Sequence, residues 1–220
     1  RPRPDPDAPN DRAQRHPPNR DPTTTWIQMG KKQAAPDAEL DADGLVVQKY
    51  RSMVLVVVPA HDFGDECLRY ARSSLYNVHV GTRVVSVQSA EAVHGRLQDE
   101  FLVEGTLAEE DTETYSGVVF AGGEGALELA RNEDALRLAR GAARGGKLIG
   151  AWGHAVAVLG AAGLLKGRRV TGHPSIRDGL RQYGAKVSTR QVEVDGHLVT
   201  GIDESSGMRF GKALATLVGI

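Results

Sequence analysis

Runs of apolar, often β-branched residues alternate with amphipathic stretches over most of the chain. Residues 54–58 and 117–120 are continuous apolar runs, which is typical of strands buried on both faces of a parallel sheet. Helical spacing of apolar residues follows at 63–74 and again at 134–143. This alternation predicts an α/β fold, with an open, mostly parallel sheet and helices on both faces.

Shorter segments complete the predicted order of elements. Helices are expected from residue 174 to about 183 and from 207 to about 218, and Asp195-Gly196 is a strong signal for a hairpin turn. Short strands are expected at 77–80, 84–87, 101–103, 169–171, 186–188, 191–194 and 197–200, and residues 45–47 could add an edge strand.

The most informative stretch begins at Lys147. Residues 147–152 form a predicted buried strand that turns sharply at Gly153 and continues into a helix at 155–159. In α/β enzymes a strand, turn and helix of this kind often display a catalytic nucleophile at the apex. Gly153 has no side chain and cannot attack a substrate. The stretch therefore predicts an enzyme scaffold that lacks its nucleophile.

Charge and cysteine content exclude several classes of function. The chain has 27 Lys and Arg against 28 Asp and Glu, which gives no electrostatic footprint for nucleic acid or an anionic membrane. Its one cysteine, Cys67, excludes an internal disulfide framework and a multi-cysteine zinc site, and it fits a cytoplasmic location. Cys67 falls on the inward stripe of the helix at 63–74, where a buried, inert role is expected.

The chain divides into a tail and a domain. Residues 1–52 are predicted to be a Pro-rich disordered tail and linker, because this segment has too little apolar surface to offset the entropy of ordering. Residues 53–220 form the predicted domain. We expect no transmembrane helix and no signal peptide, since the chain lacks both a run of about 18 apolar residues and an apolar leader.

Several motifs along the domain occur in a recognisable order. They are 118–123 (VVFAGG), 147–154 (KLIGAWGH), 164–171 (LLKGRRVT), 175–178 (SIRD) and 194–200 (VDGHLVT). Together they make the domain resemble the ThiJ/PfpI (DJ-one) family of the class I glutamine amidotransferase-like superfamily. The resemblance implies a flavodoxin-like sandwich that assembles as a dimer or larger homo-oligomer. Members of that family are described as cysteine peptidases, glyoxalase or deglycase-type enzymes, isonitrile hydratases, chaperones and stress proteins.

Two site positions depart from the family pattern. The family's elbow carries a cysteine, commonly in Ala-Ile-Cys-His-Gly, where this chain has Gly153 in Ala-Trp-Gly-His-Ala. The family also places a glutamate after the first strand, in Phe-Glu-Asp, where this chain has Gly64 in Phe-Gly-Asp. The resemblance therefore implies that both members of the cysteine and glutamate pair are absent. A one-residue shift could bring Asp65 into the pocket, but the ungapped match argues against it.

The remaining groups at the elbow suit binding. Backbone N–H groups around Gly122, Gly123 and His154 could form a nest for an anion or a carbonyl oxygen. His154 matches the family's histidine, and it is equally well interpreted as a general acid/base or as a structural histidine at a helix start. Trp152 is either a wall of the pocket or core filler. We expect a small-molecule ligand and no cofactor.

A second polar group follows the first strand. His61, Asp62, Asp65 and Glu66 stand at the carboxyl end of this strand, where open α/β sheets bind ligands. They could hold a metal or activate a water molecule. A solvated loop with acids that favour the helix dipole is the better interpretation, and no metal site is expected.

Three functional hypotheses follow from these residues. The first is a catalytically silent protein that binds a ligand, has a structural role or forms oligomers. The second is a hydrolase or lyase, similar to a peptidase, glyoxalase or hydratase, that uses His154 and a carboxylate with water. The third is an accessory C-terminal domain of a larger enzyme, suggested by the Pro-rich leading segment and the start at Arg1.

Overall fold

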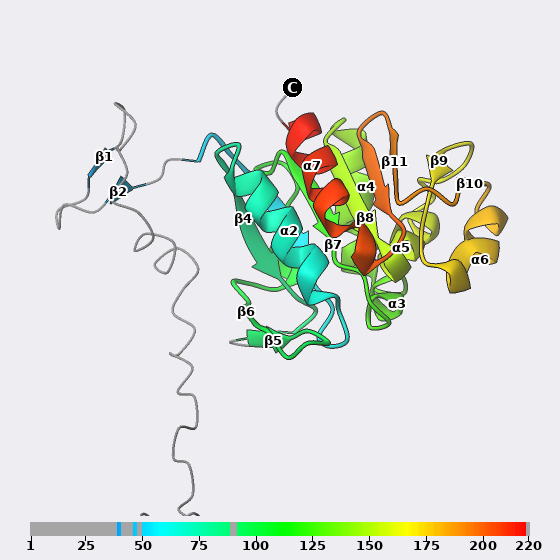
Figure 1. The fold of residues 1–220 in the computed structure, drawn as a ribbon, viewed down its shortest axis with the longest axis horizontal. Helices are drawn as coiled ribbons and strands as arrows, with labels where there is room; N and C mark the ends of the chain where they lie inside the picture. Colours follow the sequence, from blue (N-terminus) through cyan, green and yellow to red (C-terminus); the bar gives the residue numbers. More distant parts are fainter. Residues whose placement is uncertain (1–38, 41–45, 48–49, 89–91, 219–220) are drawn as a thin grey trace, which may run out of the picture. The chain divides into compact units, whose positions relative to one another are not determined.

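The computed structural model describes residues 39–40, 46–47, 50–88 and 92–218. Most of the predicted tail and linker therefore lies outside the described residues. A six-stranded sheet in the order β11-β12-β8-β7-β3-β4 forms the centre of the domain (Figure 1). These strands are β3 (Ser52–Val57), β4 (Val80–Val85), β7 (Gly117–Phe120), β8 (Leu148–Trp152), β11 (Val192–Asp195) and β12 (Leu198–Gly201). All neighbouring pairs are parallel except β11 with β12, so the predicted mostly parallel sheet is confirmed.

Helices cover both faces of this sheet. Helices α2 (Asp65–Tyr76) and α7 (Gly207–Val218) pack side by side on one face, over a core that includes Leu68 and Phe210 (Figure 1). The other face packs against α3 (Ala126–Leu129), α4 (Glu133–Arg144) and α5 (Val156–Ala161), and α6 (Arg177–Gln182) follows α5. This arrangement confirms the flavodoxin-like fold. Within the described part of the chain, no helix has the length and apolar character needed to cross a membrane.

Short elements complete the described structure. Two-residue strands pair as β1 (Glu39–Leu40) with β2 (Val46–Val47) and as β9 (Arg169–Val170) with β10 (Lys186–Val187). A small hairpin joins β5 (Ala92–His94) to β6 (Glu100–Leu102). The 3₁₀ helices are η2 (Leu107–Glu109), η3 (Gly153–Ala155), η4 (Pro174–Ile176) and η5 (Glu204–Ser206). The strand expected at 45–47 exists as β2, but it pairs with β1 and is not an edge of the central sheet.

The structure corrects the strands expected at 77–80 and 84–87. Val80, Val84 and Val85 belong to the single strand β4. Residues 77–79 form the turn after α2, in which the Asn77 N–H donates to Ser73 O at 3.0 Å and the His79 N–H donates to Tyr76 O at 2.9 Å. His79 then turns the chain through a left-handed conformation with φ of 59°. The sequence pattern predicted two strands because Gly81, Thr82 and Arg83 separate the apolar residues at the two ends of β4.

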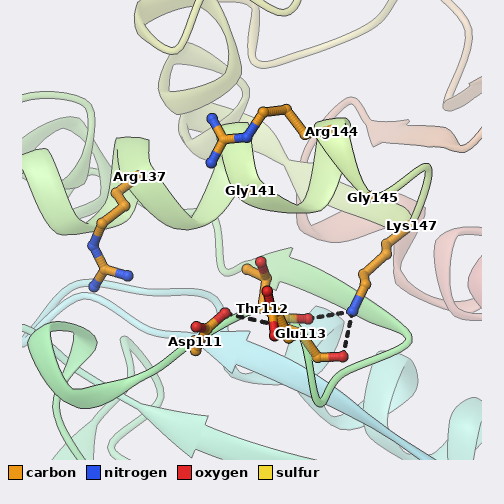
Figure 2. A pocket seen from close by; sticks show the side chains of 8 residues that line it. All are labelled: Asp111, Thr112, Glu113, Arg137, Gly141, Arg144, Gly145 and Lys147. Carbon is orange, nitrogen blue, oxygen red and sulfur yellow. Dashed lines mark hydrogen bonds between the residues drawn. The ribbon is translucent and has the colours of Figure 1, made fainter.

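A cationic side chain joins two loops at the amino end of β8. Lys147 Nζ donates to the carbonyl oxygens of Glu113 and Tyr115, each at 2.7 Å, and also to that of Thr112 (Figure 2). A hollow of about 610 Å³ adjoins these contacts, with Arg137 and Arg144 on its α4 side (Figure 2). Gly153 follows the opposite, carboxyl end of β8. Open α/β sheets bind their ligands at the carboxyl ends of the strands, so the elbow is the stronger candidate site.

Candidate functional site

The turn after β8 has the sharp backbone conformation that exposes a nucleophile in related folds, with Gly153 at its apex. Gly153 has a φ of 58°, in the left-handed region that L-residues enter at a cost of about 1–2 kcal/mol. A Cβ built on Gly153 would meet no atom closer than 3.9 Å, where it reaches Gly122 Cα and Gly123 N. A small side chain would therefore fit at the apex. The elbow keeps the shape of a nucleophile turn and has no side chain on it.

Close backbone packing forms the wall beside the apex. The Gly64 N–H donates to Gly122 O at 2.8 Å. A Cβ at Gly122 would lie 2.2 Å from Trp152 O, and one at Gly123, whose φ is 128°, would lie 1.9 Å from Asp62 O. Only glycine permits such approaches. The loops that follow β3, β7 and β8 therefore meet through their main chains next to Gly153.

Glu204 brings a carboxyl group to this wall from the start of η5. Its Oε1 accepts a hydrogen bond from Trp152 Nε1 at 2.7 Å, and its Oε2 accepts one from the Cys67 N–H at 3.1 Å. A Cβ built on Gly64 would lie only 1.6 Å from Oε1. The carboxyl group of Glu204 thus fills the space into which a side chain at position 64 would project.

Burial raises the pKa of the Glu204 carboxyl above its ordinary value of 4.5, and the nearby Asp65 adds to this rise. The two N–H donors from Cys67 and Trp152, together with the charge of Arg96, oppose it. A hollow of about 320 Å³ opens beside the carboxyl group. It is lined by Gly64, Asp65, Glu66, Arg96, Leu97 and Glu204. The carboxyl group of Glu204 is therefore partly desolvated and lines a small hollow that could hold a ligand.

Asp65 lines the same hollow, but its carboxylate is committed to the main chain. The side chain is 1% exposed, with Oδ2 accepting from the Leu97 N–H at 2.8 Å and Oδ1 accepting from the Asp99 N–H at 3.1 Å. These bonds hold the turn between β5 and β6 against the start of α2. The structure places Asp65 in a positioning role for one wall of the hollow.

His154, directly after the apex, is buried and joined to a second histidine. Its ring stacks on that of His173, with centroids 4.1 Å apart, and its Nε2 lies 3.1 Å from Ser175 Oγ. Burial lowers the pKa of His154, and the neighbouring His173 and Arg96 lower it further against the opposing effect of Glu124. The neutral form of the imidazole is therefore favoured.

Cys67 and Trp152 are both buried in the core, where their main role is structural. Cys67 is fully buried, as predicted, and burial together with the charges of Glu204 and Asp203 raises the pKa of its thiol. A thiol in such surroundings is a poor nucleophile. Trp152 is also fully buried and packs edge-to-face on Phe210, with ring centroids 5.4 Å apart. Its indole both fills the core and positions Glu204.

The polar residues after β3 do not form a metal site. His61 Nδ1 lies 3.0 Å from Asp62 Oδ2 on an exposed loop, and the side chain of Asp65 turns toward the β5–β6 turn. Across the residues that the structure describes, no three His, Cys, Asp or Glu side chains converge as metal ligands would. The solvated-loop interpretation fits His61, Asp62 and Glu66, which are exposed, but it is wrong for Asp65, which is buried.

Comparison with known proteins identifies the family of this chain. Residues 52–217 match the model of the DJ-1/PfpI family. The chain belongs to the DJ-1/PfpI family. An uncharacterized protein of Methanocaldococcus jannaschii is 30% identical over 161 residues, which cover 72% of this chain and 78% of that protein. The deglycase PfpI of Pyrococcus furiosus is 28% identical over 148 residues, covering 67% of this chain and 89% of the relative.

Solved structures of DJ-1/PfpI proteins share the fold. The crystal structure of a ThiJ/PfpI domain protein from Brachyspira murdochii matches with a TM-score of 0.73 and 23% identity. The match covers 77% of this chain and 97% of that protein. At this identity the likeness shows the common architecture, so the chemistry of this DJ-1/PfpI protein has to be argued from its own site residues.

The sequence pattern did not predict four polar residues of the site. Arg96, His173, Ser175 and Glu204 are distant in sequence from Gly153, by between 20 and 57 positions. One signal was available for Glu204, because it follows β12 and so stands at the carboxyl end of a sheet strand. Ser175 belongs to a motif that supported the family resemblance, but its partners are set by tertiary packing.

Proposed function

We propose that this chain is a ligand-binding member of the DJ-1/PfpI family that is silent in thiol-dependent reactions. The observation that carries this proposal is Gly153 at the apex of an otherwise intact elbow. Cys67, the one thiol of the chain, lies on the buried face of α2 and has a raised pKa, so it does not substitute for an apex cysteine.

The wall beside the apex supports binding of a small polar molecule. The main-chain nitrogen of Gly123 lies 3.9 Å from where a Cβ of Gly153 would be, and Glu204 offers a desolvated carboxyl group near Gly64. Arg96 adds a positive charge at the hollow. A donor, a carboxyl group and a cation together suit a small carbonyl or carboxylic acid compound.

Binding is tested with glyoxylate as the probe, by following amide and indole signals in NMR titrations of the full chain. We expect saturable shifts at Gly123, His154 and the Trp152 indole N–H, and weaker affinity in Glu204→Ala. Shifts confined to the hollow at Arg144, or no saturable shift anywhere, would overturn the proposal.

Glu204 favours a second candidate, a hydrolase or lyase that uses water. A carboxyl group with a raised pKa is suited to general acid/base work, and the neutral form of His154 is favoured close to the apex. A panel of esters, amides and aldehydes tests this candidate. Turnover that falls about 100-fold in Glu204→Gln would support it, and inertness of the wild-type chain toward the whole panel would exclude it.

Assembly and location remain proposals. We infer a homo-oligomer, because exposed apolar side chains such as Tyr70 and Met208 lie on α2 and α7, and this is the form that the family resemblance implies. Light scattering of the purified chain tests the oligomer: a mass of 23.6 kDa would contradict it.

On the sequence alone we also propose a cytoplasmic location and no nucleic acid or membrane partner. A role as an accessory domain of a larger enzyme is a further proposal from the sequence.

A further inference from the structure

A serine hydroxyl near the elbow contacts two imidazole rings. Ser175 Oγ lies 2.8 Å from His173 Nδ1 and 3.1 Å from His154 Nε2. The two rings stack 29° from parallel, so they meet the hydroxyl as one unit. The backbone N–H of His173 also donates to Gly153 O at 3.3 Å, which links this group to the apex. Ser175 itself is exposed at the start of η4.

One tautomer of His173 satisfies both contacts at its Nδ1. The Ser175 backbone N–H, which can only donate, lies 3.4 Å from this nitrogen, so we assign Nδ1 as the unprotonated nitrogen of the ring. The Ser175 hydroxyl, at the shorter distance of 2.8 Å, then donates the main hydrogen bond to Nδ1, whose lone pair it shares with the backbone N–H. The Oγ then accepts from the Nε2–H of His154, whose neutral state its burial favours.

We propose that Ser175 is a nucleophile for acyl transfer from small carboxylic esters, with His173 as its general base. A helix cap accounts for the contact between His173 and the Ser175 backbone N–H. It does not account for an exposed hydroxyl that contacts both imidazoles. A serine hydroxyl is activated by an adjacent base that accepts its proton, and His173 stands in that position. His154 is a positioning residue, because its N–H orients the Oγ lone pairs. The proposal goes beyond the ligand site, since it uses neither Glu204 nor a thiol.

The reaction would proceed in two steps. Ser175 Oγ forms a bond to the ester carbonyl carbon while its proton passes to His173 Nδ1. The bond to the alkoxy oxygen then breaks, and the leaving alcohol takes the proton from His173. A water molecule next gives a proton to His173 and attacks the acyl carbon. The bond between the acyl carbon and Ser175 Oγ breaks, the carboxylic acid leaves, and the proton on His173 returns to Oγ. The sum is ester plus water giving acid plus alcohol.

A fluorophosphonate probe tests the proposal on the full chain, with peptide mass spectrometry to locate the label. We expect Ser175 to be phosphonylated, and the label to disappear in Ser175→Ala. His173→Asn keeps an oxygen that can cap η4 but removes the base, and labelling should slow by about 100-fold. His154→Gln, which retains an N–H donor, should label faster than His154→Ala.

Ser205 supplies the matched control. It is also exposed, but its hydroxyl donates to Asp203 Oδ1 and contacts no imidazole in the described structure. Ser205→Ala should leave the labelling rate unchanged. The proposal is overturned if Ser175 labels no faster than Ser205, or if folded His173→Asn labels at the wild-type rate. Circular dichroism of each variant confirms that it is folded.

Discussion

The carboxyl group of Glu204 and the missing side chain of Gly64 occupy the same space. A Cβ at position 64 would overlap Oε1 of Glu204 at 1.6 Å, and the Glu204 carboxyl is held there by Trp152 Nε1 and the Cys67 N–H. The two residues are therefore mutually dependent. A carboxyl group reaches this wall of the site from the loop after β12, whereas the family pattern supplies one from the loop after β3.

Gly64→Ala tests this dependence. The new methyl group should displace Glu204 and leave two N–H donors unpaired, which we expect to lower the free energy of unfolding by about 2 kcal/mol. Urea denaturation measures this change. The double variant Gly64→Ala, Glu204→Ala should show a smaller loss than the sum of the two single variants.

Gly179→Ala is the control for that substitution. Gly179 lies in α6, and a Cβ built there meets nothing within 4 Å. Stability should stay the same or rise, by up to about 1 kcal/mol. Equal losses in Gly64→Ala and Gly179→Ala, or strictly additive losses at 64 and 204, would show that the overlap at Glu204 has no energetic consequence.

The pH dependence of stability should carry a contribution from Glu204. Its folded-state pKa is raised above 4.5, so the folded chain retains the proton after the unfolded chain has lost it. The associated stability is complete below about pH 4.5 and is lost as pH rises through the folded-state pKa. The difference in unfolding free energy between wild type and Glu204→Gln should fall across this range. A difference that is constant from pH 4 to 8 would contradict the raised pKa.

His154 should act in the opposite direction. Its folded-state pKa is lowered below 6.5 by burial and by the neighbouring His173 and Arg96, against the effect of Glu124. The unfolded chain takes up the proton first as pH falls, so the contribution is complete above about pH 6.5 and is lost below it. NMR titration of the His154 ring should give a midpoint below that of free histidine. A midpoint at or above 6.5 would contradict this account.

Much of the fold follows from apolar patterning, while the site depends on packing. The buried runs at β3, β7 and β8 are local signals, and they appear where they were predicted. Asp195-Gly196 also marks the hairpin, but the two turn residues are Gly196 and His197, because Asp195 ends β11 and pairs with Leu198. The absence of a side chain at the apex could also be predicted locally, because it depends on the single residue Gly153. Glu204 could not be inferred from a window of sequence, since its bond to Cys67 N spans 137 positions. The same holds for the bridge from Ser175 to His154, which depends on how η4 packs against the elbow.

Lys147 gives a prediction for the far end of β8. Its ammonium group satisfies the carbonyl oxygens of Thr112, Glu113 and Tyr115, and hydrogen bonds from a charged donor are worth about 1.5–3 kcal/mol. Lys147→Met should therefore lower the free energy of unfolding by about 2 kcal/mol and speed amide exchange at residues 112–115. Lys166→Met, at an exposed position, should change neither quantity. Unchanged exchange at 112–115 in Lys147→Met would contradict this role.

The central claim, that the elbow works without a thiol, is tested most directly by the rate at which the purified chain consumes glyoxal. With Gly153 at the apex and Cys67 buried, wild type and Cys67→Ala should both match the uncatalysed rate. Consumption by the wild-type chain at many times the uncatalysed rate, abolished in folded Cys67→Ala, would contradict the claim.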